Sequence, residues 1–173
     1  TTAIVGASGS GKTTLVKLLL GYFAPTSGNI FLGDTPLQDY DMTSWRHSCG
    51  VVLQDSHVFS ESLARNIAVE DKHIDRTRLR IAARQSNLEE FIEKLPLKYQ
   101  TMVGAEGVGL SRGQEQRIFI ARALYKDPSF VFLDEATNSL DANNERIITG
   151  NLLDFCKGRT VLIVAHRLST IRH

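Results

Sequence analysis

The chain has 173 residues, 42% hydrophobic and 23% charged, a balance that predicts a folded domain with one well-filled core and room for a sub-domain. Its formal net charge of +1 argues against the strongly basic surface of nucleic-acid-binding proteins, so no nucleic-acid partner is expected. Two cysteines, Cys49 and Cys156, favour a reducing, cytosolic compartment over a disulfide framework, and no apolar run approaches the roughly 20 residues that span a bilayer.

The first recognisable segment, residues 6–14, reads GASGSGKTT and fits the phosphate-binding pattern of Gly, four residues, Gly, Lys and Thr. The apolar residues 1–5 before it predict a buried strand, and the helical spacing of residues 15–23 after it predicts a helix. The alternative is a glycine-rich turn with a chance Lys-Thr, which the flanking strand and helix disfavour. The predicted nucleotide-binding residues of the loop are Gly6, Ala7, Ser8, Gly9, Ser10, Gly11, Lys12, Thr13 and Thr14.

The three glycines of this loop allow a tight turn in which successive backbone N–H groups point inward. The helix that begins at the end of the loop favours an anion at its N-terminus. Lys12 is expected to reach the β- and γ-phosphates of a nucleotide, and the Thr13 hydroxyl is expected to bind Mg²⁺. The loop therefore predicts a site for a nucleotide and a magnesium ion.

The rest of the chain predicts strands toward both ends and helices between them. Residues 25–33 combine turn residues with a short strand, and residues 50–53 form a strand that ends at Gln54. The helical segments in the middle carry charge on one side and apolar residues on the other. The remaining predicted elements are helices 61–69, 74–85 and 88–95, an irregular glycine-rich segment 101–109, a helix 111–125, a strand 129–133, a helix 143–155 and a strand 161–164.

This order of elements predicts an α/β fold, in which a mostly parallel sheet with flanking helices carries an inserted helical sub-domain. Within one domain of residues 1–173, we expect residues 1–55 and 127–173 to form the core and residues 56–126 to form the sub-domain. The sequence opens directly into a core strand and stops soon after another strand. We therefore expect a piece of a longer chain, truncated at both ends.

Two carboxylates, Asp134 and Glu135, follow the apolar strand 129–133. Ligands of open α/β sheets bind at the carboxyl ends of the strands, so both acids are expected beside the phosphate loop. There Asp134 is placed to hold Mg²⁺ opposite Thr13, and Glu135 is placed to orient or deprotonate a water that attacks the γ-phosphate. The alternative is a polar strand end that begins a turn, which the phosphate loop disfavours.

Residues 110–114 read LSRGQ and resemble the signature motif LSGGQ of the ATP-binding-cassette (ABC) superfamily. Other landmarks of that family appear in its order: Gln54 resembles the Q-loop glutamine, residues 138–141 (NSLD) resemble the D-loop, and His166 resembles the switch histidine. The six motifs together cover essentially the whole chain. The resemblance implies an ATPase with a RecA-like P-loop NTPase core, an inserted ABC helical sub-domain, and ATP and Mg²⁺ as ligands.

The resemblance also implies a head-to-tail homodimer, in which each ATP lies between the phosphate loop of one copy and the signature motif of the other. Ser111 begins a predicted helix, so its hydroxyl and the nearby N–H groups are placed to bind the partner copy's γ-phosphate. The implied catalytic residues are Lys12, Gln54, Glu135 and His166, the implied metal-binding residues are Thr13, Gln54 and Asp134, and the implied nucleotide-binding residues outside the loop are Ser111, Gly113, Gln114 and Asp141.

Some of these residues have plain structural alternatives. Ser111 is also a good helix N-cap, and both roles are compatible. Gln54 fits an ordinary strand terminus, and a single histidine such as His166 after an apolar strand is more often structural than catalytic. Arg112 departs from the family pattern, which has glycine at this position.

Finer features resemble exporters. Residues 101–107 resemble the loop that exporters place against their transmembrane domains, and residues 45–68 resemble the exporter Q-loop region. The sequence is similar to the ATP-binding domains of bacterial peptide and bacteriocin exporters, some of which carry a peptidase domain. We therefore expect an ATPase motor that works with transmembrane domains at the cytoplasmic face of the inner membrane and exports a peptide or bacteriocin. The alternative is a soluble ABC ATPase that acts on a non-membrane partner.

Overall fold

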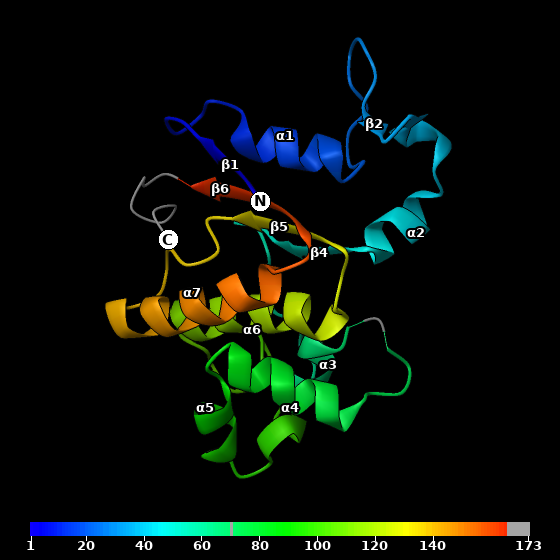
Figure 1. Ribbon diagram of the computed structural model, residues 1–173. Helices are drawn as coiled ribbons and strands as arrows, with labels where there is room; N and C mark the ends of the chain where they lie inside the picture. Colours follow the sequence, from blue (N-terminus) through cyan, green and yellow to red (C-terminus); the bar gives the residue numbers. More distant parts are fainter. Residues whose placement is uncertain (70, 166–173) are drawn as a thin grey trace.

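The computed structural model describes residues 1–69 and 71–165, and its centre is a sheet of four parallel strands (Figure 1). The strands lie in the order β1 (Thr2–Val5), β6 (Thr160–Ala165), β5 (Phe130–Asp134) and β4 (Cys49–Val52). In this register Asp134 lies opposite Val164, near the ends of their strands. The carboxyl ends of all four strands therefore meet at one edge of the sheet, which is where ligands bind in such folds.

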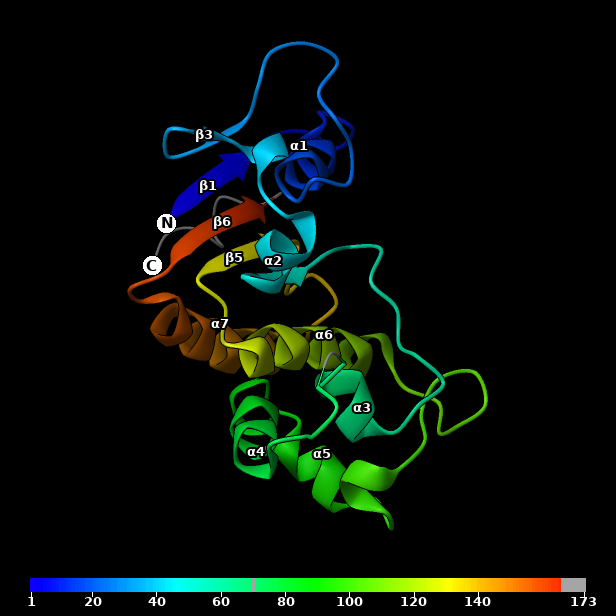
Figure 2. The ribbon, with the colours of Figure 1, turned by 90° about the vertical axis from the view of Figure 1, so that its right-hand side faces the viewer.

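Helices cover both faces of the sheet (Figures 1 and 2). On one face lie α1 (Lys12–Leu19) and α2 (Met42–His47), and on the other lie α6 (Arg112–Lys126) and α7 (Ala142–Cys156). Beyond α6 lie three shorter helices, α3 (Leu63–Ile67), α4 (Arg76–Gln85) and α5 (Glu89–Glu93). Helix α6 thus lies between the sheet and these three helices.

Alternate residues of the strands pack into two apolar clusters, one on each face of the sheet. Phe132 and Val164 pack with α1 and α2, whereas Val131 and Leu133 pack with α6, α7 and the helical sub-domain. Because both faces are covered, β5 reads as a nearly continuous apolar run in the sequence. The parallel sheet with flanking helices confirms the predicted α/β fold.

The helix after the glycine loop is shorter than the sequence predicts, because the prediction extended it to residue 23. Helix α1 ends at Leu19, and Gly21 takes a left-handed φ of 67°. The Gly21 N–H donates to the Leu18 carbonyl at 3.0 Å and the Tyr22 N–H donates to the Lys17 carbonyl at 2.9 Å. This pair of hydrogen bonds is the usual glycine-terminated helix end, which the apolar spacing of the segment conceals.

Some short elements were not predicted from the sequence. Helix α2 begins where the Asp41 carboxylate accepts the Ser44 N–H at 2.8 Å, and its six residues are too few to show a helical period. The predicted short strand within residues 25–33 is β2, and it pairs with an unpredicted antiparallel strand. The predicted strand β2 spans Phe31–Leu32. The unpredicted elements are its partner β3 (Thr35–Pro36) and the 3₁₀ turns Leu37–Asp39 and Lys98–Gln100.

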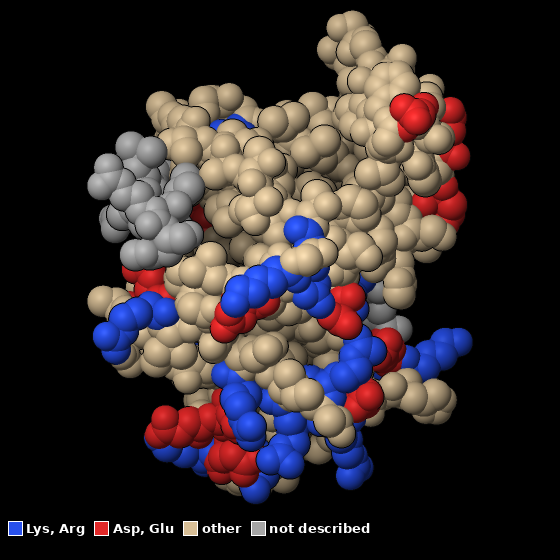
Figure 3. All heavy atoms as spheres, in the orientation of Figure 1, with Lys and Arg blue, Asp and Glu red and all other residues tan. Residues whose placement is uncertain are grey.

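Charged side chains of both signs gather over the lower part of the face shown in Figure 3, around α4 and α5. They include the ion pairs Arg84–Glu89, at 2.8 Å, and Lys94–Glu90, at 2.7 Å. Such exposed pairs add little stability and mark a solvated surface.

Among the described residues, no helix is long and apolar enough to cross a membrane. The division into a core (1–55 and 127–173) and a sub-domain (56–126) stays a prediction.

A buried polar network fixes the segment that leads from β4 into the helical sub-domain. The side-chain amide of Asn66 is fully buried, donates to the carbonyls of Phe59, Glu61 and Ser62, and accepts the Phe59 N–H at 2.9 Å. The Arg122 guanidinium of α6 donates to the Asn66 side chain at 2.8 Å and to the Asn66 carbonyl at 2.5 Å. Burial lowers the pKa of Arg122 to about 10.

We predict that Asn66→Ala lowers the free energy of unfolding by about 2–4 kcal/mol, because it leaves the Phe59 N–H and one of the two terminal nitrogens of the Arg122 guanidinium without this acceptor in a buried place. Urea denaturation of the variant measures this loss. Asn29→Ala, which removes an exposed amide, is the matched control and is expected to change stability by less than about 0.5 kcal/mol. Equal stabilities of the two variants would contradict the prediction.

Candidate nucleotide-binding site

The glycine loop connects the carboxyl end of β1 to the first residue of α1. Gly9 and Gly11 have φ angles of 77° and 89°, in the left-handed region that residues with a Cβ rarely adopt. No side chain among the described residues caps the N-terminus of α1, where Gly11 is the N-cap. The first N–H groups of the helix are therefore available to an anion, which their dipoles also attract.

Lys12 lies inside this loop and is only 8% exposed. Its ammonium group donates to the carbonyls of Gly6 and Ala7 at 2.8 and 2.7 Å and to the Ser10 hydroxyl at 3.3 Å. The loop therefore holds a buried positive charge beside the open N-terminus of α1. These two features together favour a group with several negative charges, such as the phosphates of a nucleotide.

The Thr13 hydroxyl donates to the Asp134 carboxylate at 2.6 Å, which joins the start of α1 to the end of β5. Asp134 is 2% exposed. Hydroxyl and carboxylate oxygens are the ligands that Mg²⁺ prefers, and this ion usually takes only one or two protein ligands when phosphate oxygens supply others. The residues present therefore fit a magnesium ion that a nucleotide brings with it. Within the described ranges, no group of three or more acidic, His or Cys side chains is arranged so that it could hold a metal ion by itself.

Glu135 has a φ of 53°, a conformation that costs a residue with a side chain on the order of 1 kcal/mol. Its N–H donates to the Val164 carbonyl of β6 at 3.2 Å. Its own carbonyl accepts the Gln116 side-chain amide at 2.9 Å and the Asn138 N–H at 3.2 Å. Its carboxylate accepts a hydrogen bond from the Asn138 side chain. These contacts hold the carboxylate just beyond the strand end that carries Asp134.

Gln54 lies exposed in the turn directly after β4. The Ser56 N–H closes this turn by donating to the Leu53 carbonyl at 3.2 Å. The neighbouring Asp55 carboxylate accepts a hydrogen bond from Lys17 of α1 at 2.6 Å, and this bond lowers the pKa of Asp55. The turn is thereby tied to the helix that begins at the phosphate loop.

The signature residues lie at the N-terminus of α6. The Ser111 hydroxyl accepts the Gln114 N–H at 3.3 Å, and the Gln114 side chain accepts the Ser111 N–H at 2.8 Å, which is a capping box. Ser111 is thus the helix N-cap that the sequence indicates. A Cβ added to Gly113 would lie 3.3 Å from the Ser139 carbonyl, so α6 approaches the segment after Glu135 closely.

Asp141 caps the other helix of this region, α7. Its carboxylate accepts the N–H groups of Asn143 and Asn144 at 3.1 and 3.0 Å, and it also accepts the Asn144 side-chain amide at 2.5 Å. The backbone hydrogen bond from Asn144 is the largest cause of its lowered pKa. Asp141 is exposed, so its carboxylate remains accessible at the surface beside α6.

The structure thus gathers the candidate residues into two neighbouring groups. The loop residues, Gln54, Asp134 and Glu135 lie at the carboxyl edge of the sheet. The second group, at the helix N-termini beside it, comprises Ser111, Gly113, Gln114 and Asp141. His166 lies outside the described residues.

Sequence reasoning missed Gln116, whose side chain connects the two groups. Its helical spacing from Gly113 places both on one side of α6, but the sequence gives no sign of the loop that they meet.

A phosphate loop whose threonine meets a buried strand-end aspartate, on a parallel α/β sheet, defines a P-loop nucleotide-binding domain. A family model described as ABC transporter matches residues 1–138. The chain belongs to the ABC transporter family, as the sequence motifs predict, and corresponds to the ATP-binding domain. ATP-binding domains of this family hydrolyse ATP.

Known proteins resemble the chain along nearly its whole length. It is 46% identical over 173 residues to an ATP-dependent lipid A-core flippase of Saccharophagus degradans. This match covers 100% of the chain and 30% of the flippase. It is 45% identical over 170 residues to a toxin RTX-I translocation ATP-binding protein of Actinobacillus pleuropneumoniae, covering 98% of this chain and 24% of that protein. The chain therefore spans less than a third of these relatives.

A solved structure of a bacterial Atm1-family ABC exporter with ATP bound has the same fold, with a TM-score of 0.92 at 38% sequence identity. The match covers 98% of this chain and 30% of the exporter chain. The P-loop NTPase fold with an ABC sub-domain is therefore confirmed.

We predict that Asp134→Asn raises the Mg²⁺ concentration needed for half-maximal ATP hydrolysis by about 10- to 100-fold, because it removes a negative charge next to the Thr13 hydroxyl. Magnesium titrations of the ATPase rate in the full-length protein measure this change. Asp154→Asn, at an exposed pair with Lys157, is the control and is expected to leave the titration unchanged. A normal magnesium requirement in Asp134→Asn would remove this residue from the metal site.

Proposed function

We propose that the chain is the ATP-hydrolysing motor domain of an exporter. It works as a head-to-tail dimer around two Mg-ATP, in contact with transmembrane domains at the cytoplasmic face of the inner membrane. The observation that carries the proposal is the 2.6 Å hydrogen bond between Thr13 and the buried Asp134. It joins a phosphate loop to a strand-end carboxylate, as binding of a magnesium-nucleotide complex requires.

Each residue of the sheet edge has a role in this mechanism. Lys12 and the N-terminus of α1 bind the β- and γ-phosphates, and Thr13 and Asp134 hold Mg²⁺, with Gln54 completing its surroundings. The ion, when bound, neutralises charge on the phosphate oxygens. The Glu135 carboxylate accepts a proton from the attacking water as the water oxygen bonds to the γ-phosphorus. The bond between the γ-phosphorus and the bridging oxygen breaks at the same time, and ADP and phosphate are released. Asn138 orients that carboxylate through its side-chain amide. His166 contacts the γ-phosphate.

The surface at the N-termini of α6 and α7 supports the dimer. Ser111, Arg112, Ser139 and Asp141 are all exposed, and a Cβ added to Gly113 would lie 3.3 Å from the Ser139 carbonyl oxygen. Ser111 and the first N–H groups of α6 form a second anion-binding end, separate from that of α1. In the dimer this end, with Gly113 and Gln114, binds the γ-phosphate held by the partner copy, and Asp141 faces the partner copy's phosphate loop.

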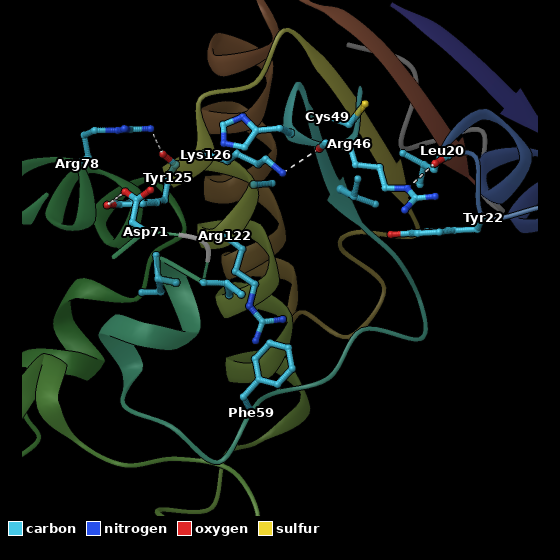
Figure 4. A pocket seen from close by; sticks show the side chains of 15 residues that line it. Leu20, Tyr22, Arg46, Cys49, Phe59, Asp71, Arg78, Arg122, Tyr125 and Lys126 are labelled. Atoms are coloured by element: carbon cyan, nitrogen blue, oxygen red, sulfur yellow. Dashed lines mark hydrogen bonds between the residues drawn. The ribbon is translucent and has the colours of Figure 1, made fainter. Parts of the chain in front are cut away.

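We propose that the transmembrane domains contact a groove of about 430 Å³ between the core and the helical sub-domain (Figure 4). Tyr22 and Arg46 border it on the core side, where the Arg46 guanidinium lies 5.1 Å from the centre of the Tyr22 ring. Phe59 and Arg122 border it on the sub-domain side. Val51 of β4 also lines the groove and lies three residues before Gln54 in the chain.

The cargo is a finer part of the proposal. The relatives are named for the translocation of a toxin and for the flipping of lipid A-core. The similarity of the sequence as a whole to bacterial peptide and bacteriocin exporters favours a peptide or bacteriocin as the cargo. Transport assays of the full-length protein with a labelled peptide and a labelled lipid separate these possibilities.

We predict that Glu135→Gln lowers the rate of ATP hydrolysis by about 100-fold or more, because it removes the proton acceptor while preserving the shape of the side chain. ATP binding persists, so an ATP-bound dimer accumulates on size-exclusion chromatography. The control is Glu90→Gln on the surface of α5, where hydrolysis is expected to stay normal. Near-normal turnover in Glu135→Gln would show that another group activates the water.

We predict that Lys12→Ala and Ser111→Ala inactivate the homodimer separately but complement each other when one copy of each is combined. The mixed dimer has one site with both changes and one intact site, so its activity is expected to return to on the order of half the wild-type value. ATPase measurements on purified heterodimers test this. Sites that belong to single copies would leave the mixed dimer as inactive as either parent.

A further inference from the structure

We propose that Gln116 is a positioning residue that sets the backbone of Glu135 and couples it to the signature end of α6. The inference rests on the proposed function of Glu135 in hydrolysis. Gln116 lies outside the signature motif and outside the residues assigned above to phosphate or magnesium. Its side chain nevertheless contacts both ends of the short segment 135–139, which begins at the second strand-end acid.

Both polar atoms of the Gln116 side chain are used in this contact. The amide nitrogen donates to the carbonyl of Glu135 at 2.9 Å, and the amide oxygen accepts the N–H of Ser139 at 2.7 Å. One side chain therefore closes residues 135–139 into a bridged turn. A hydrocarbon side chain of the same length makes neither bond, and a carboxylate keeps only the bond to Ser139.

The backbone of Glu135 is where such a bridge has the most effect. Its φ of 53° is unfavourable for a residue with a side chain, so surrounding contacts must hold it. The Glu135 N–H is held by Val164 at 3.2 Å, and its carbonyl by Gln116 and Asn138. Loss of the Gln116 bond removes the shortest of these backbone contacts and lets the peptide rotate. The carboxylate would then leave the position from which it reaches a water on the γ-phosphate.

The same helix carries the signature residues. Gly113 lies one turn before Gln116, and a Cβ there would lie 3.3 Å from the Ser139 carbonyl. Ser111 caps the helix two residues earlier still. A shift of the α6 N-terminus, when Ser111 engages the partner copy's nucleotide, therefore moves Gln116 and the turn that holds Glu135. Closure on one ATP thereby sets the catalytic carboxylate that acts on the other ATP of the dimer.

Steady-state ATP hydrolysis by the full-length protein tests this inference with three variants. Gln116→Met is expected to lower kcat by at least tenfold, to leave the KM for ATP within twofold of wild type, and to preserve the melting temperature. Gln116→Glu is expected to do the same, because it loses the bond to the Glu135 carbonyl. Gln38→Met, the same substitution at an exposed position, is the matched control and is expected to be fully active.

A double variant separates positioning from general damage. If Gln116 acts through Glu135, adding Gln116→Met to Glu135→Gln lowers the residual single-turnover rate by less than twofold. A further tenfold loss in the double variant, or a rise in KM that accounts for the whole defect, would overturn the inference. If Gln116→Met does not fold, the same criteria apply to Gln116→Glu.

The outcomes also separate the inference from the function on which it rests. A kcat of Gln116→Met within twofold of wild type, beside an inactive Glu135→Gln, overturns the role of Gln116 alone. Substantial activity in Glu135→Gln overturns the proposed role of Glu135, and the role of Gln116 with it.

Discussion

The alignment of the four parallel strand ends is the constraint on which the rest of the site depends. It brings the loop after β1 next to the end of β5, so that Thr13 and Asp134 meet at 2.6 Å although 121 positions separate them in the chain. The apolar clusters on both faces of the sheet fix this alignment, because a shift in register would move strand residues out of their packing. The chemistry at the edge therefore relies on burial in the layers.

Helix α6 extends this constraint into the helical sub-domain. Its buried face packs against the sheet and against α3 and α4, and Arg122 fixes the segment after β4 through Asn66. Its N-terminus lies against the turn that carries Glu135. One helix thus carries the signature residues and contacts the turn that holds the candidate water-activating residue. A rigid element in this place is suited to transmit movement between the helical sub-domain and the core.

The sequence predicted the sheet, the phosphate loop and the strand-end acids, because each follows from a local pattern: a β-branched run, a glycine spacing, or carboxylates after an apolar strand. Helix α2 was too short to show a period, and the end of α1 depends on the left-handed Gly21. The bridge from Gln116 to Glu135 and Ser139 joins positions far apart in the chain. Its side-chain pattern is ordinary for a helix surface, so only the tertiary structure reveals it.

A crystal structure of the full-length protein with Mg²⁺ and a non-hydrolysable ATP analogue tests the central claim most directly. Our account predicts that the β- and γ-phosphates lie within hydrogen-bond distance of Lys12 and the first N–H groups of α1. It also predicts that the Thr13 hydroxyl lies about 2.1 Å from the metal. Phosphates bound away from the N-terminus of α1, or a metal bound without Thr13 and Asp134, would contradict it.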